Sequence, residues 1–306
     1  KGCTKLDVRI DPGAEDREPT IRIWNNGKGI PVHIHKEENM YLPEMLFGHL
    51  LTGSNFDDNE KRLTGGRHGY GAKLTNIFSK SFTVETLDST KGILYRQTWR
   101  NNMTQASEPE LIQVDDASTS SAGDYTCITF RPDMKRLADD PDATMIDTQD
   151  YGYMCRRVFD AAGCAAGSLQ VFLNGRDVSL SSYADYTNMY RSESSPRMCY
   201  SKLNSRWTIG VGLSEGHSFD SVSFVNGMST PRGGTHVNAV VSQVVKKLQE
   251  TVAKMEPDLA DTLAPGLLRR NLFVSCNALI ENPGFDSQMK EYLTSNPSTF
   301  GSPYTL

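Results

Sequence analysis

The sequence predicts an α+β chain of two domains in which strands and helices alternate. Apolar residues recur at every second position in several segments, which is typical of strands. A clear amphipathic helix begins at Val237, because apolar residues return there at helical spacing up to Val252. The length of 306 residues suits two domains of roughly 150 residues each.

Composition narrows the range of partners. Hydrophobic residues make up 38% of the chain and charged residues 23%, with a net charge of −5. A protein that grips DNA over its whole surface would be basic, so any nucleic-acid contact must be local or indirect. The sequence shows no run near the ~20 apolar residues of a membrane span, and residues 1–7 lack the apolar run of a secretory signal.

Cysteine and histidine spacing gives no metal motif. The six cysteines form no Cys-x-x-Cys pair, so we expect reduced, mostly buried thiols in an intracellular protein. His33 and His35 alternate as on a strand face, with no carboxylate cluster nearby. We therefore expect no metal site there.

The first two strands, residues 5–10 and 20–24, are expected to pair as a hairpin. The second strand runs into a tight, open loop, Asn25-Asn26-Gly27-Lys28-Gly29-Ile30-Pro31. The Asn25 amide can donate and accept hydrogen bonds, which suits the edge of a purine base. An ordinary Asn-Gly turn is the alternative, and taken alone it is the more common one.

A helix over residues 44–51 and a charged loop at 57–62 precede the most distinctive stretch, Gly65-Gly66-Arg67-His68-Gly69-Tyr70-Gly71-Ala72-Lys73. Glycines let main-chain N–H groups approach a ligand closely, and a helix is expected to start at Ala72. Such a loop favours a polyphosphate cradle, although a plain tight turn is the alternative. A charged loop that leads into a cradle suggests a lid.

The cradle differs from the two commonest nucleotide motifs. A P-loop requires lysine directly after its second glycine, but Ala72 stands there. A dinucleotide fingerprint requires a glycine where this chain has Leu74.

The remaining elements follow in order. Strands are expected at residues 81–87, 93–99, 125–130, 169–173, 207–213, 221–225 and 272–276, and helices at 150–167 and from 237. Strands 93–99 and 125–130 are expected to form a hairpin, joined by residues 101–124 as a long polar connection. Tyr183, Tyr186 and Tyr190 are expected to serve packing. A domain boundary is expected near residues 175–180.

Several segments together resemble a known family. They are residues 24–31, the turn Thr52-Gly53-Ser54-Asn55, the loop at 65–73, residues 224–226 together with Gly233-Gly234-Thr235-His236, and the late loop 277–290. They are similar to the GHKL ATP-binding fold of gyrase-type topoisomerases, Hsp90 chaperones, MutL-type repair proteins and histidine kinases, and most similar to eukaryotic type IIA DNA topoisomerases. Two departures are His68, where the family has Asn, and Gly53, where relatives often have Ser.

The resemblance implies an α/β sandwich, with a mixed sheet and helices on one face, over residues 1–178. A smaller α+β transducer domain is implied over residues 179–306. The resemblance also implies ATP as the ligand. Asn25 would contact adenine, and Ser54 and Asn55 the ribose and nearby phosphate. Lys290 would be the catalytic cation on the γ-phosphate, with Gln288 beside it. Amides of the loop would hold the triphosphate, from Gly66, Arg67, His68, Gly69, Tyr70, Gly71, Ala72 and Lys73.

Two family residues have no counterpart in this sequence. A general-base Glu and an Asn that ligates Mg²⁺ are expected on a helix upstream of Lys1. The strand-cleaving tyrosine domain of the family also lies outside this sequence.

The resemblance implies ATP-dependent strand passage by a homodimer acting on double-stranded DNA, in the nucleus or in an organelle. A basic cluster of relatives is thin here, with Ala253-Lys254-Met255-Glu256 in its place. Alternatives are another branch of the same fold, such as a repair or chaperone ATPase, and a nucleotide-binding clamp that does not hydrolyse ATP.

Overall fold

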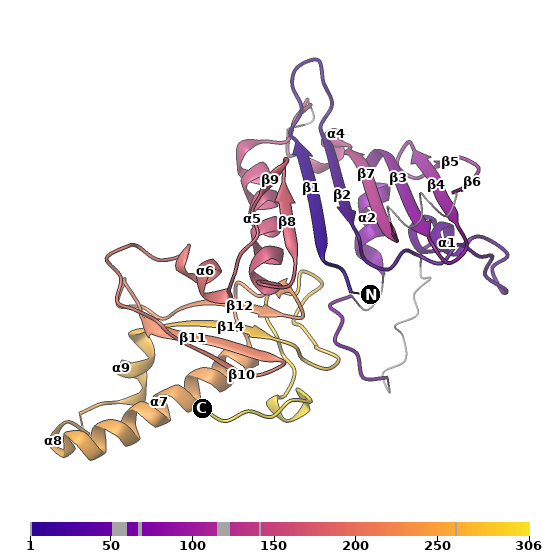
Figure 1. Ribbon diagram of the computed structural model, residues 1–306. Coiled ribbons are helices and arrows are strands. Elements are labelled where there is room, and N and C mark those ends of the chain that lie inside the picture. Colours follow the sequence, from indigo (N-terminus) through magenta and orange to yellow (C-terminus); the bar gives the residue numbers. More distant parts are fainter. Residues whose placement is uncertain (1, 51–59, 67–68, 115–122, 141, 261) are drawn as a thin grey trace. The chain divides into compact units, whose positions relative to one another are not determined.

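The computed structural model describes residues 2–50, 60–66, 69–114, 123–140, 142–260 and 262–306 (Figure 1). The chain forms two compact units. The first comprises Lys1–Phe56, Gly66–Ala162 and Ala166–Leu180, and the second Asp57–Gly65, Gly163–Ala165 and Ser181–Leu306. The main division thus falls two residues after the expected limit at 178. The short segment before the glycine-rich loop belongs to the second unit, which its sequence position did not suggest.

The first unit is built on a mixed sheet. Among the described residues its strands run in the order β5-β4-β3-β7-β2-β1-β8-β9, with β6 also paired to β4. Strands β1 and β8 are parallel, whereas β1 and β2 form the expected antiparallel pair. The strands are β1 (Lys5–Asp11), β2 (Thr20–Asn25), β3 (Ser79–Asp88), β4 (Ile93–Arg100), β5 (Gln105–Ala106), β6 (Glu110–Gln113), β7 (Tyr125–Pro132), β8 (Gln170–Leu173) and β9 (Arg176–Asp177).

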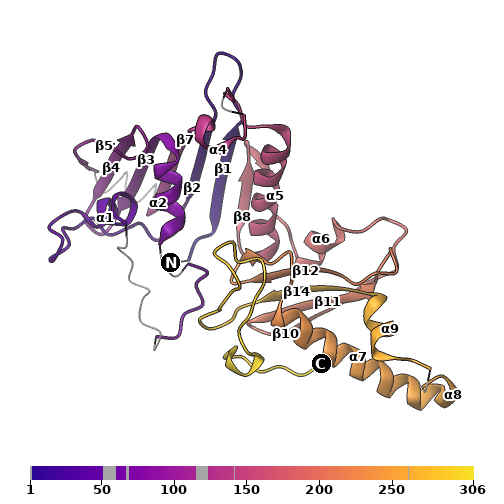
Figure 2. The ribbon, with the colours of Figure 1, turned by 180° about the vertical axis from the view of Figure 1, so that it is seen from behind.

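Helices cover one face of this sheet, as expected. The register aligns Phe82, Phe130, Ile21 and Ile10 across four strands, so their side chains share a face. Ile10 and Ile21 pack in one cluster with residues of the helix Thr148–Cys164. Phe82 packs with Phe47 in a second cluster. The helices are α1 (Leu42–Gly48), α2 (Tyr70–Ile77), α4 (Met134–Leu137) and α5 (Thr148–Cys164). Figure 2 shows α2 and α5 on the same side of the sheet.

The second unit packs a smaller sheet against a long helix. Its strands run in the order β10-β11-β14-β12-β13, and β12 and β14 are parallel. The valine stripe predicted from the sequence is buried between Val237 and Val245, where it packs with Trp207 and Val274 in one core. The elements are α6 (Tyr183–Asn188), β10 (Cys199–Asn204), β11 (Trp207–Leu213), β12 (Asp220–Val225), β13 (Met228–Ser229), α7 (Thr235–Met255), α8 (Pro257–Ala260), α9 (Pro265–Arg270), β14 (Leu272–Ala278) and the 3₁₀ turn η1 (Pro297–Thr299).

Several local expectations were wrong. Strands β4 and β7 do not form the expected hairpin, because β3 lies between them and pairs with both. Residues 101–124 contain the short strands β5 and β6, and the tyrosine-rich stretch contains α6 and β10. The six cysteines, all at described positions, form no disulfide, but they are not mostly buried: Cys127 and Cys276 are buried, whereas Cys3 and Cys199 are exposed. Tyr183 and Tyr186 do serve packing, because both are buried. Among the described residues, every helix is too short or too polar to cross a membrane.

Candidate functional site

Part of the helix-facing side of the first sheet is uncovered near the end of β2. The register places Ile23 beside Val8 and Ile128, in the row that helices bury elsewhere, yet Ile23 is 36% exposed. Figure 2 shows this stretch of β1 and β2 between α2 and α5. Asn25 follows two residues later on the same face, beside Thr126 of β7. The sheet therefore offers an apolar floor with an amide at its edge, which suits a flat heterocycle with polar edges.

The Asn25 side chain also shapes its own loop. Its Oδ1 accepts a 3.0 Å hydrogen bond from the Gly27 N–H, and its Nδ2 donates weakly, at 3.5 Å, to the Thr126 carbonyl. These contacts are those of the ordinary turn that the sequence left as an alternative. They do not preclude ligand binding, because an amide oxygen has a second lone pair and the Nδ2 contact is long.

Gly29 is required by close packing. A Cβ atom at this position would lie 2.1 Å from the carbonyl oxygen of Leu87, inside any permitted contact. The neighbouring Ile30 N–H donates to the Thr86 hydroxyl at 2.9 Å, and this hydroxyl in turn donates to the Tyr125 carbonyl at 3.0 Å. The loop after β2 is thus fixed against β3 and β7.

The glycine-rich loop ends at the N-terminus of α2, two residues earlier than expected. Gly69 is its N-cap residue, with φ +66°, and no described side chain caps the helix. The N-terminus of a helix carries partial positive charge, which favours an anion. Gly66 and Gly71 have nothing within 4 Å of an added Cβ, and neither has a positive φ. Neither the backbone nor the packing of the described residues therefore requires glycine there, which favours close approach by a ligand.

Of the other predicted ATP-binding residues, some lie in described parts of the chain and some do not. Lys73 lies on α2 and is 1% exposed, and burial lowers its pKa. The predicted residues Ser54, Asn55, Arg67 and His68 lie outside the described residues.

Lys290 lies in the second unit and contacts the beginning of the glycine-rich loop. Its Nζ donates a 2.8 Å hydrogen bond to the Gly65 carbonyl, and burial lowers its pKa. Lys290 also has φ +60°, a conformation that favours Gly or Asn over Lys. Gln288 is exposed in the same loop. The predicted catalytic lysine therefore contacts Gly65, the residue immediately before Gly66.

The Gly233-Gly234 pair holds the Lys290 loop in place. Gly234 has φ +142°, and an added Cβ would lie 2.5 Å from the Leu293 nitrogen. The Leu293 N–H donates to the Gly233 carbonyl at 3.2 Å, and the Thr235 N–H donates to the Leu293 carbonyl at 3.0 Å. These glycines thus allow the backbone three residues after Lys290 to lie directly on the start of α7.

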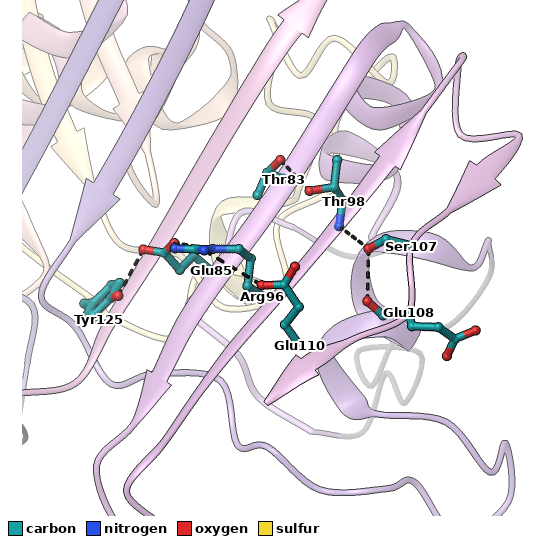
Figure 3. A network of polar contacts seen from close by, with 8 residues as sticks. All are labelled: Thr83, Glu85, Arg96, Thr98, Ser107, Glu108, Glu110 and Tyr125. Atoms are coloured by element: carbon teal, nitrogen blue, oxygen red, sulfur yellow. Dashed lines mark hydrogen bonds and ion pairs between the residues drawn. The ribbon is translucent and has the colours of Figure 1, made fainter. Parts of the chain in front are cut away.

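A carboxylate on the sheet does not serve this site. Glu85 is engaged by Arg96, through hydrogen bonds of 2.9 and 2.7 Å, and by the Tyr125 hydroxyl at 3.0 Å (Figure 3). The register aligns Glu85 with Cys127 and Trp24, on the face opposite Asn25. Glu85 is therefore a satisfied structural ion pair and not a general base for a ligand at Asn25. The described residues contain no group of three or more His, Cys, Asp or Glu side chains that could hold a metal.

Comparison with known proteins identifies the family. The sequence profile of the DNA gyrase B family matches residues 179–300. The chain is 44% identical over 290 residues to DNA topoisomerase 2 of Arabidopsis thaliana, covering 92% of this chain and 19% of that protein. It also matches the crystal structure of the ATPase and transducer domains of DNA topoisomerase II from Balamuthia mandrillaris, with a TM-score of 0.90 and 47% identity, covering 99% of this chain and 74% of that one. The chain belongs to the DNA topoisomerase II family.

A second structure agrees with this assignment. The ATPase region of Saccharomyces cerevisiae topoisomerase II matches with a TM-score of 0.87 and 41% identity, covering 99% of this chain and 74% of that one. Within the topoisomerase II family the chain therefore corresponds to the ATPase and transducer part, with the predicted GHKL fold. It spans about a fifth of the length of the curated relative from Arabidopsis.

Two contacts near the candidate site were not predicted from the sequence. Thr126 lies beside Asn25 only because β7 pairs with β2, a contact between residues 101 positions apart. Asn282 hydrogen-bonds to residues 60–62 across 220 positions. For Asn282, the sequence offers one indication of a structural role, its position directly before Pro283 in a loop.

Proposed function

We propose that this chain binds ATP and hydrolyses it as the ATP-operated part of a type II DNA topoisomerase. The observation that carries the proposal is the hydrogen bond of Lys290 to Gly65, which places an ammonium group at the entrance of the glycine-rich loop. The family assignment supports the same ligand, because two matched structures are named as ATPase regions or domains.

The chemistry assigns a part to each group. The adenine ring would lie on the floor at Ile23, with its polar edge toward Asn25. Amides of the loop and the start of α2 would hold the triphosphate, because N–H groups and the helix dipole favour negative charge. Lys290 would leave the Gly65 carbonyl and place its charge on the γ-phosphate, where charge develops as the phosphoryl group transfers. Gln288 would lie beside it, and Ser54 and Asn55 would bind the ribose.

Mg²⁺ fits this site only as a partner of the nucleotide. The described residues offer no carboxylate cluster for it, and Mg²⁺ keeps several waters when it binds phosphates through few protein ligands. When bound together with ATP, the metal would supply positive charge that offsets the charge of the phosphates.

Hydrolysis would drive motion, because Lys290 belongs to the second unit whereas α2 belongs to the first. A triphosphate held by both would tie the units together, and loss of the γ-phosphate would release that tie. Two copies closed in this way would form a gate for a DNA duplex. With a net charge of −5, the chain would contact that duplex locally or indirectly. The DNA substrate would place the protein in the nucleus, or in an organelle that holds DNA.

Two measurements on the intact protein test the proposal. ATP binding followed by phosphate release is expected, together with a shift from monomer to dimer in sedimentation when a non-hydrolysable ATP analogue is added. ATP binding without phosphate release would instead favour the alternative function, a nucleotide-binding clamp that does not hydrolyse ATP. A monomer with and without the analogue would contradict the gate.

A further inference from the structure

The segment before the glycine-rich loop, residues 60–65, is attached to the first half of the late loop 277–290. The Arg62 N–H donates to the Asn282 Oδ1 at 3.1 Å, and the Asn282 N–H donates to the Arg62 carbonyl at 3.0 Å. The Asn282 Nδ2 donates to the Glu60 carbonyl at 3.1 Å. One asparagine thus makes three hydrogen bonds to the backbone of residues 60–62, two through its side-chain amide and one through its main-chain N–H.

Two further contacts flank this attachment. Lys61 Nζ lies 3.2 Å from a carboxylate oxygen of Glu281, the residue before Asn282. Gly65 packs so closely on Met228 that an added Cβ would lie 2.6 Å from the Met228 sulfur. Together with the Lys290 bond, these contacts hold the segment at both ends, at residues 60–62 and at Gly65.

The backbone of Asn282 suits this role. Its φ is +43°, in the left-handed region that Asn tolerates better than other residues with a side chain. This conformation lets the main-chain N–H and the side-chain amide contact the same segment. Asn282 is exposed, so water competes with its hydrogen bonds and each contributes little. Such an attachment can open and close reversibly.

Glu281 connects the attachment to the end of the chain. Its other carboxylate oxygen pairs with Arg206 at 2.9 Å, and Arg206 also donates to the Gly301 carbonyl at 3.1 Å. The Glu281 N–H donates to the Phe300 carbonyl at 3.2 Å. Glu281 therefore connects Lys61 to the segment at residues 300–301, directly through Phe300 and indirectly through Arg206.

We propose that Asn282, supported by Glu281, is a positioning residue that latches residues 60–65 to the second unit. The latch holds residues 60–65, which lead into the glycine-rich loop, beside Lys290. Release of the latch would free residues 60–65 from that position. The inference rests on the proposed ATPase function, and it adds a residue that does not itself touch the nucleotide.

The test uses the intact protein and the variant Asn282→Gly. Glycine keeps the left-handed backbone without strain and removes only the side-chain amide. Asn282→Asp is the rescue variant, because its oxygen can still accept from the Arg62 N–H. Asn101→Gly, at φ +51° on an exposed turn of the first unit, is the matched control.

Two readouts separate the latch from the proposed function. Without nucleotide, hydrogen exchange at the Arg62 amide should be roughly threefold to tenfold faster in Asn282→Gly, slower again in Asn282→Asp, and unchanged in Asn101→Gly. With ATP, Asn282→Gly should raise KM more than it lowers kcat, because fewer molecules have the loop in place.

Wild-type exchange at Arg62 in Asn282→Gly would overturn the latch, whatever the protein does with ATP. Faster exchange with an unchanged KM would overturn the positioning role. An unmodified protein that neither binds nor hydrolyses ATP would instead overturn the proposed function, while the exchange measurement would still decide whether the latch exists.

Discussion

Lys290 donates a 2.8 Å hydrogen bond from its Nζ to the carbonyl oxygen of Gly65, although 225 positions separate the two residues. A carbonyl oxygen is a modest partner for an ammonium group, and burial lowers the pKa of this lysine. A phosphate oxygen carries more negative charge and would bind the same ammonium more strongly. The lysine can therefore exchange its hydrogen bond with the Gly65 carbonyl for a stronger one with a phosphate oxygen when a nucleotide binds.

Lys290→Ala should reduce phosphate release roughly a hundredfold while ATP affinity changes little, because the cation acts on charge that develops during transfer. The measurement is kcat from phosphate release beside Kd from titration with a non-hydrolysable analogue. Lys202→Ala, an exposed lysine on β10, is the control. Loss of affinity with an unchanged kcat would show that Lys290 binds the ground state and the transition state equally, which contradicts the proposed role.

Gly71→Ala should weaken ATP binding roughly tenfold without loss of stability. An added Cβ meets nothing within 4 Å in the protein, and alanine is the better helix former in α2. Any loss of affinity would then come from crowding the nucleotide. Titration with the analogue and thermal unfolding check the two parts, with Gly266→Ala as a control that is equally open. Unchanged affinity would mean that the loop does not contact the phosphates.

Local pattern was enough to predict the interior of both sheets. Strands β3, β7 and β11 alternate in sequence because one side of each is buried, and each was predicted within a few residues. Strand β6 was missed because all four of its residues are exposed at the sheet edge, so it has no buried face to create alternation. Strand β10 was missed for a similar reason, since it lies at the other sheet's edge with no buried residue.

The candidate site was predictable only where it is local. The glycine-rich loop and the start of α2 lie within nine residues of sequence, and glycine chemistry alone indicates an anion site there. The contact between Asn282 and Arg62 joins residues 220 positions apart. On the Arg62 side it uses the main-chain N–H, a group that nearly every residue has, so the residue type gives no signal. No residue type at positions 60–62 signals that partner, so the contact needed the fold.

Gly234→Ala should destabilise the second unit by about 3 kcal/mol or more, because φ +142° strains any side chain and the added Cβ would meet the Leu293 backbone at 2.5 Å. Gly227→Ala, at φ +77° but in open space, separates the two causes and should cost only about 1 kcal/mol. Urea unfolding midpoints measure both. Similar losses in the two variants would mean that backbone strain, and not the approach of Leu293, explains Gly234.

His236 should make the second unit sensitive to acid. The side chain is 0% exposed beside Thr230, and burial lowers its pKa from 6.5 to about 3. The folded chain therefore keeps this histidine neutral, while the unfolded chain takes up a proton below pH 6.5. Because the unfolded state binds more protons in this range, stability falls as the pH falls from 6.5 toward 3.

The loss from His236 should amount to about 2 kcal/mol between pH 7 and pH 5. His236→Gln has no group to titrate there, although it should be less stable than the unmodified protein at pH 7. Urea unfolding at pH 7, 6 and 5 should thus show the stability gap between the two proteins narrowing as the pH falls. Carboxylates common to both proteins cancel in that difference. A gap that stays constant with pH would mean that His236 accepts its proton in the folded state, and that its burial is not what sets its charge.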